Sequence, residues 1–203
     1  MKKIDYKKEL RSLYAPSSKE ISIVDVPAMN YVMIDGKGDP NTAKEYTEAI
    51  EALYSLSYTM KFMVKKDKPG INYGVLPLEG LWWVPNMEEF SAQRKDDWFW
   101  TAMIMQPEVI TKEIFRTAIE SVRKKKNLAA IEKVRFESYI EGKCSQILYF
   151  GHYSDETSTI ALLHNFIAEK GYKRHGKHHE IYLNDPRKTA AAKLKTIIRQ
   201  PMQ

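Results

Sequence analysis

The segment 177–184 places a carboxylate among apolar and aromatic residues. Glu180 alternates with His178 and Tyr182, so the three side chains share one face of an extended strand. A buried carboxylate must either be paired or face a cavity, because removing an isolated charge from water is costly. We expect Glu180 to face a cavity, where it could complement a cationic guest or, with a pKa raised by burial, act as a general base. An edge strand open to solvent is the alternative.

The tryptophans gather on two segments, as Trp82, Trp83, Trp98 and Trp100. Wide aromatic surfaces with few polar groups are typical of pockets for planar guests. Side chains alternate along a strand, so Trp98 and Trp100 share a face, whereas at most one of Trp82 and Trp83 can line the same cleft. Filling of the core is the competing interpretation for each tryptophan.

Other reactive side chains give weaker signals. His178 and His179 point to opposite faces of the predicted strand and cannot easily share a metal with the nearby His175, so we expect surface histidines. Cys144 is the single cysteine, which excludes a disulfide framework and a multi-cysteine zinc cluster, and no neighbouring motif supplies a base for its thiol. We expect no metal and no cofactor.

The elements that must position these residues occur in a repeated order. The first half predicts a strand at 20–36, a helix at 42–66 with apolar residues at three- and four-residue steps, and strands at 73–84 and 97–106. Asn41 is the predicted N-cap of the helix. A connecting amphipathic helix is predicted at 111–126.

The second half predicts a similar order of strands and helix. It predicts a strand pair at 134–153 hinged at 141–143, a helix at 155–170 followed by Gly171 as its left-handed cap, and strands at 177–184 and 194–200. Similar segments at corresponding positions favour a duplication. An example is Ile104-Met105-Gln106-Pro107, which resembles Ile198-Arg199-Gln200-Pro201. Coincidence is the alternative.

We therefore predict an α+β fold with antiparallel sheets and duplicated strand-helix-strand-strand modules. The predicted boundaries are an N-terminal extension at 1–19 and one domain at 20–203, made of a first module (20–107), a connecting helix region (108–133) and a second module (134–203).

Composition excludes several classes of protein. The chain has 203 residues, 43% of them hydrophobic, and its net charge of +6 is spread along the sequence. The densest basic run, 123–126, ends a predicted helix, where cations complement the helix dipole, and no nucleic-acid reader motif accompanies it. No apolar run approaches the roughly 20 residues that span a bilayer, and the first residues lack a secretory signal. We expect cytoplasmic localisation, with neither nucleic acid nor membrane as a partner.

Three segments resemble stand-alone members of the GyrI-like small-molecule-binding family over residues 20–202. They are Leu76-Pro77-Leu78-Glu79-Gly80-Leu81-Trp82-Trp83, the run from Trp98 to Pro107, and Glu180-Ile181-Tyr182-Leu183-Asn184-Asp185-Pro186-Arg187-Lys188-Thr189 with Leu194-Lys195-Thr196. The resemblance implies two modules related by a pseudo-twofold axis around a ligand cleft. Relatives fused to a helix-turn-helix regulate transcription, but only about 20 residues precede the first predicted strand here, too few for that module.

Stand-alone members of this family are linked to gyrase inhibition, drug sequestration and hydrolytic opening of cyclopropane-bearing DNA alkylators. On this resemblance, Glu180 or Glu79 would act on water. Tyr182 or Tyr139 would donate a hydrogen bond to the oxygen that becomes a phenolate. Trp83 and Trp100 would sandwich the guest's ring. The full predicted ligand-binding set is Trp83, Trp98, Trp100, Tyr139, His178 and Met103.

The leading functional prediction is a detoxifying protein that binds bulky aromatic or cationic small molecules in a central cleft and hydrolyses strained cyclopropanoids. One alternative is a non-catalytic protein that sequesters lipophilic cations or drugs. Others are a gyrase-contacting inhibitor and an interaction module that uses an exposed sheet face. A homodimer is also left open.

Overall fold

The computed structural model describes residues 4–67, 71–90 and 94–203. Residues 1–3 of the predicted N-terminal extension lie outside these ranges. The chain divides into two compact units. Unit 1 comprises Met1–Tyr6, Met29–Leu76 and Trp83–Tyr139, and unit 2 comprises Lys7–Ala28, Pro77–Trp82 and Ile140–Gln203.

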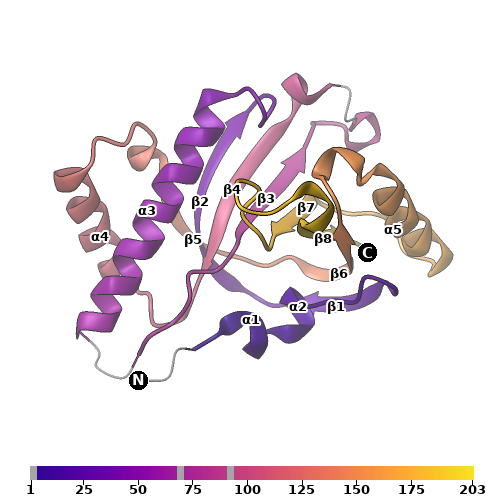
Figure 1. Ribbon diagram of the computed structural model, residues 1–203. Coiled ribbons are helices and arrows are strands. Elements are labelled where there is room, and N and C mark those ends of the chain that lie inside the picture. The colour runs from indigo at the N-terminus through magenta and orange to yellow at the C-terminus, as the bar shows by residue number, and fades with distance from the viewer. Residues whose placement is uncertain (1–3, 68–70, 91–93) are drawn as a thin grey trace. The chain divides into compact units, whose positions relative to one another are not determined.

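Unit 1 contains a three-stranded antiparallel sheet covered by helices. Its central strand is β2 (Met29–Lys37), which pairs with β4 (Phe99–Gln106) on one side and β5 (Arg135–Tyr139) on the other. Helix α3 (Lys44–Asp67) lies against β2 and β4 and packs against α4 (Lys112–Lys125) (Figure 1). Short 3₁₀ turns η1 (Met87–Glu89), η2 (Lys95–Asp97) and η3 (Ile131–Lys133) complete the unit.

Helix α3 forms where the apolar spacing predicts it. Its buried stripe includes Ala49, Leu53, Leu56 and Met60, which recur at steps of three and four residues and face the sheet. The N-cap prediction is wrong, because the backbone and side-chain amides of Asn41 donate to Asp39 Oδ1 at 2.9 and 2.7 Å. Asp39 thus organises the turn before α3.

Unit 2 contains a five-stranded antiparallel sheet in the order β1-β6-β8-β7-β3. Helix α5 contacts β6 and β8, and α2 contacts β1 (Figure 1). The bounds are α1 (Tyr6–Glu9), α2 (Arg11–Tyr14), β1 (Ser22–Val26), β3 (Leu78–Trp83), β6 (Gly142–Phe150), η4 (Tyr153–Asp155), α5 (Thr157–Glu169), β7 (His178–Tyr182), η5 (Ala191–Lys193) and β8 (Lys195–Pro201).

The α+β class, the antiparallel pairing and the duplicated order of elements are confirmed. In chain order β2-α3-β3-β4 is followed by β6-α5-β7-β8, and β2 pairs with β4 as β6 pairs with β8. Gly171, with a φ of 78°, is the left-handed residue after α5, as predicted. The module boundaries and the cleft between the modules stay predictions.

Two predicted elements are wrong in their continuity. The single strand at 20–36 is interrupted at Pro27-Ala28: β1 pairs with β6 in unit 2, whereas β2 pairs with β4 and β5 in unit 1. Pro27 has no N–H for a ladder, which favours a break there. The predicted strand pair at 134–153 also separates, since β5 pairs with β2 while β6 pairs with β1 and β8.

The predicted strand at 73–84 begins only at Leu78, and Tyr73 makes an isolated parallel bridge with Ile4. Within the described ranges, every helix is too short or too polar to cross a membrane.

Candidate functional site

Strand β7 holds Glu180 in a paired, buried position. The Tyr182 hydroxyl donates to Glu180 Oε2 at 2.6 Å, and His178 Nε2 lies 3.1 Å from Glu180 Oε1. The shared face of these three residues is therefore confirmed. Glu180 is only 6% exposed on a strand that lies between β8 and β3, so the solvent-facing alternative is wrong. Both carboxylate oxygens have protein partners, so Glu180 is paired, and a cavity beside it stays a prediction.

A second carboxyl group joins this pair from the N-cap of helix α5. Glu156 occupies the N-cap position of α5 and is buried. One ligand atom each from Glu156, His178 and Glu180 lie within 4.8 Å of one another. We call these three residues the acidic cluster; their donor set could hold a metal ion. Sequence reasoning missed Glu156, and its only signal was a carboxylate at the start of a predicted helix.

The environment of Glu180 lowers the pKa of its carboxyl group. Burial raises this pKa, but the hydrogen bond and charge of His178, together with hydrogen bonds from Tyr182 and Glu156, outweigh burial and leave the pKa below its usual value. The expectation of a raised pKa for Glu180 is therefore wrong, because these partners outweigh the effect of burial. The carboxylate is ionised at neutral pH.

Half-buried aromatic rings border the acidic cluster. The Tyr153 ring meets the Tyr182 ring edge to face, with centroids 6.5 Å apart, and the His152 ring centroid lies 4.1 Å from that of Tyr153. All three rings are partly exposed. We call His152, Tyr153 and Tyr182 the aromatic rim. Unit 2 thus places an ionised carboxylate next to aromatic surface that a planar guest could contact.

The opposite face of β7 carries a separate network of buried charges. Glu79 of β3 accepts a hydrogen bond from the Tyr14 hydroxyl at 2.7 Å, and its other oxygen lies 3.1 Å from His179 Nε2. His179 Nδ1 lies 2.9 Å from Glu141 Oε1, and Arg199 Nη1 donates to Glu141 Oε2 at 3.2 Å. We call Tyr14, Glu79, Glu141, His179 and Arg199 the buried network.

Charges alternate through the buried network, and the pKa values shift accordingly. Burial lowers the pKa of His179, but the charge and hydrogen bond of Glu141 and the hydrogen bond of Glu79 leave it raised. Burial raises the pKa of Glu141, but His179 and Arg199 leave it lowered. His179 therefore lies between Glu79 and Glu141, and these neighbours favour its protonated form.

The histidine predictions are partly wrong. His178 and His179 do point to opposite faces of β7, one into the acidic cluster and the other into the buried network. Both are buried, however, whereas surface positions were expected; only His175 of the three is exposed. Hydrogen-bonding carboxylates on both faces of β7 make their burial tolerable.

The predicted aromatic and methionine ligands lie in unit 1. Trp83 is half-buried and stacks on Phe99, with centroids 5.9 Å apart. Phe99 also lines an open cavity of about 400 Å³, whose other lining residues are Lys37, Val84, Pro85, Asn86, Glu89, Arg94 and Asp97. The volume falls within the range of small-molecule sites, roughly 300–1,000 Å³.

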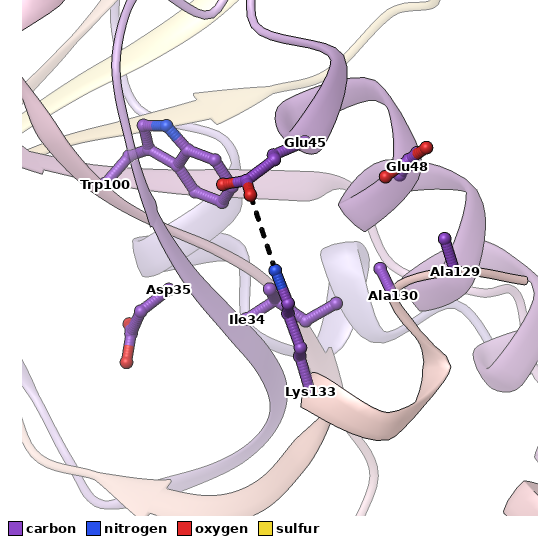
Figure 2. A pocket seen from close by; sticks show the side chains of 8 residues that line it. All are labelled: Ile34, Asp35, Glu45, Glu48, Trp100, Ala129, Ala130 and Lys133. Atoms are coloured by element: carbon purple, nitrogen blue, oxygen red, sulfur yellow. Dashed lines mark ion pairs between the residues drawn. The ribbon is translucent and has the colours of Figure 1, made fainter.

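Trp98 and Trp100 occupy more enclosed positions. Trp98 stacks on Phe90 at 4.6 Å, and Trp100 meets Tyr46 of α3 edge to face at 5.0 Å. Trp100 lines a small hollow of about 20 Å³. Lys133 and Glu45 form an ion pair there, with Nζ 3.6 Å from Oε1 (Figure 2). That volume holds about one water molecule, not a planar guest.

The two other predicted ligand residues pack within the unit 1 sheet. Met103 is fully buried and lies opposite Met33 in the β2–β4 register. Tyr139 meets Tyr31 edge to face, with centroids 6.4 Å apart. Of the predicted site residues, the structure brings Glu180, Tyr182 and His178 together. Glu79 lies in the buried network.

Comparisons with known proteins agree with this architecture. The family model described as the GyrI-like small molecule binding domain matches residues 19–202. An uncharacterized conserved protein from Listeria innocua is 39% identical, with a TM-score of 0.91 over 99% of this chain and 100% of that one. A hydrolase from Listeria innocua is 38% identical, with a TM-score of 0.88 over the whole of both chains.

The C-terminal domain of EcmrR is 13% identical, with a TM-score of 0.56 over 91% of this chain and 97% of that one. At that identity the likeness shows the fold alone. A comparison with proteins of curated function found no match.

Proposed function

This chain belongs to the GyrI-like small-molecule-binding family, and we propose that it binds bulky aromatic molecules at the aromatic rim and hydrolyses them at Glu180. The observation that carries the proposal is the position of Glu180: an ionised, almost fully buried carboxylate, oriented by Tyr182, at the border of partly exposed aromatic rings. The 38% identical relative described as a hydrolase supports a hydrolytic reaction.

The substrate class that we propose is a strained cyclopropane conjugated to a dienone. The oxygen of a water molecule would bond to the ring carbon while one carbon–carbon bond of the cyclopropane breaks. The electron pair of that bond would move to the distant carbonyl oxygen, which becomes a phenolate, and Glu180 would take the proton from the water. Since its low pKa makes Glu180 a weak base, release of ring strain and stabilisation of the phenolate must supply most of the driving force.

Tyr182 would serve this reaction in two ways. Its hydroxyl holds Glu180 Oε2 in the resting protein. As Glu180 becomes protonated it accepts hydrogen bonds less strongly, which frees the hydroxyl to donate to the developing phenolate. Glu79 is the second candidate base. Glu79 is less suited, because its side chain is fully buried and its two oxygens contact Tyr14 and His179 of the buried network.

Binding without catalysis is the second candidate function. An ionised carboxylate next to aromatic rings can also bind a lipophilic cation, because the carboxylate and the faces of the rings both attract positive charge. The participation of Trp83, Trp98, Trp100, Tyr139 and Met103 in guest binding stays a prediction, as do a gyrase contact and a homodimer.

Incubation with a cyclopropanoid, followed by mass spectrometry, separates the two functions. An enzyme yields a product heavier by one water in more than stoichiometric amounts. A binder yields no product but shows saturable quenching of tryptophan fluorescence by a planar cationic dye.

Turnover should fall by about 10²–10⁴-fold in Glu180→Gln. Turnover should be unchanged in Glu137→Gln, whose carboxylate is exposed. If Glu180→Gln and Glu79→Gln both kept wild-type turnover, neither carboxylate would be the base.

A further inference from the structure

The acidic cluster unites an imidazole and two carboxyl groups where water has little access. Glu156, His178 and Glu180 are 5%, 2% and 6% exposed. Bringing two carboxyl groups together in a buried place is unfavourable unless a proton or a cation lies between them. We propose that the acidic cluster binds a divalent transition-metal ion such as Zn²⁺, with these three residues as its protein ligands.

The distances suit such an ion. Zinc bonds of about 2.0–2.1 Å in tetrahedral geometry place neighbouring ligand atoms roughly 3.3–3.4 Å apart. His178 Nε2 and Glu180 Oε1 are 3.1 Å apart, close to that separation. The Glu156 oxygen lies within 4.8 Å of both partners, so its flexible side chain has only a short distance to close. Two of the three donors therefore need almost no rearrangement.

The surrounding structure orients these donors. His178 and Glu180 lie two residues apart on β7, which is hydrogen-bonded on both sides in the unit 2 sheet. The Tyr182 hydroxyl holds Oε2 of Glu180 and so directs Oε1 toward His178. Hydrogen bonds of this kind from outside the ligand set are a regular feature of metal sites. The mixed nitrogen and oxygen set favours zinc or a similar ion over Ca²⁺ or Mg²⁺.

Three protein ligands leave one position open in a tetrahedral site, for water or for a donor atom of a small molecule. A carboxylate oxygen that binds the ion no longer accepts a proton. We therefore expect Zn²⁺ to slow hydrolysis by Glu180, and this expectation rests on the proposed function. The proposal that the acidic cluster binds a metal ion does not depend on that function.

The test is a titration of the EDTA-treated protein with Co²⁺, whose visible absorption reports a low-coordinate site, and with Zn²⁺ by calorimetry. One ion per chain is expected. Glu156→Gln and His178→Gln should each weaken binding by more than about 100-fold, since groups outside the ligand set alone contribute about 10–100-fold. Glu169→Gln at the other end of α5 and the exposed His175→Gln are matched controls and should bind like the wild type.

Absence of stoichiometric binding to the wild type would overturn the proposal, as would wild-type affinity in folded Glu156→Gln and His178→Gln. Should a variant fail to fold, histidine-selective NMR of the wild type decides: Zn²⁺ must shift the His178 ring signals and leave those of His175 in place. Hydrolysis without metal binding would refute the metal site and leave the proposed function standing. Metal binding without hydrolysis would support the metal site and refute the proposed hydrolytic function.

Discussion

Replacing Glu141 by glutamine tests whether the buried network stabilises unit 2. Glu141 contacts His179 and Arg199, and its side chain is 1% exposed. The amide keeps the shape of the carboxylate but removes the negative charge between His179 and the guanidinium of Arg199. Removal of one partner from a buried ion pair typically costs about 3–5 kcal/mol, because the remaining charges stay buried without compensation. For a chain of this length that corresponds to a fall in Tm of about 6–20 °C.

The pH dependence of this effect has a definite sign. The pKa of Glu141 is lower in the folded state than its usual 4.5, so its contribution is complete above that pH and is lost as the pH falls through the folded value. The pKa of His179 is raised above its usual 6.5, so its contribution is complete below that pH and is lost as the pH rises through the folded value. The difference between wild type and Glu141→Gln should therefore be largest between these two usual values and shrink on either side.

Urea denaturation followed by far-UV circular dichroism, repeated across that pH range, measures the difference. Glu137→Gln is the matched control, since Glu137 pairs with Arg135 at 2.9 Å but is 54% exposed, and it should cost less than about 1 kcal/mol. Equal stabilities of the two variants would refute the assignment of a strong buried pair. A difference that is constant with pH would refute the assigned protonation states.

Three further outcomes are expected. Burial raises the pKa of the Cys144 thiol, so a disulfide reagent should leave it unmodified in the native protein and react in urea; native-state reaction would contradict its burial. Gly36→Ala should destabilise the protein by about 1–3 kcal/mol in urea melts, because its Cβ would lie 2.1 Å from Trp100 Cζ2, and Trp100→Phe in the same chain should recover part of the loss. Tyr182→Phe removes a hydrogen bond that lowers the pKa of Glu180, so the acid limb of the pH profile of hydrolysis should move to higher pH; an unmoved limb would exclude Glu180 as the titrating group.

Which residues share a face could be predicted from the sequence alone. Alternation along β7 placed His178, Glu180 and Tyr182 together and His179 opposite, and helical spacing identified the buried stripe of α3. The family resemblance and the α+β class could also be predicted, because the segments that carry them are continuous in the chain. These properties depend on backbone periods of two and 3.6 residues, which act over short distances.

Which distant groups meet depends on the tertiary structure. Glu156 approaches Glu180 from the N-cap of α5, and Glu79 and Glu141 contact His179 from separate parts of the chain. Those neighbours reversed the expected pKa shift of Glu180 and made burial of two histidines tolerable. A pKa depends on charges and hydrogen bonds within a few ångströms in space, and no local period in the sequence specifies which residues those will be.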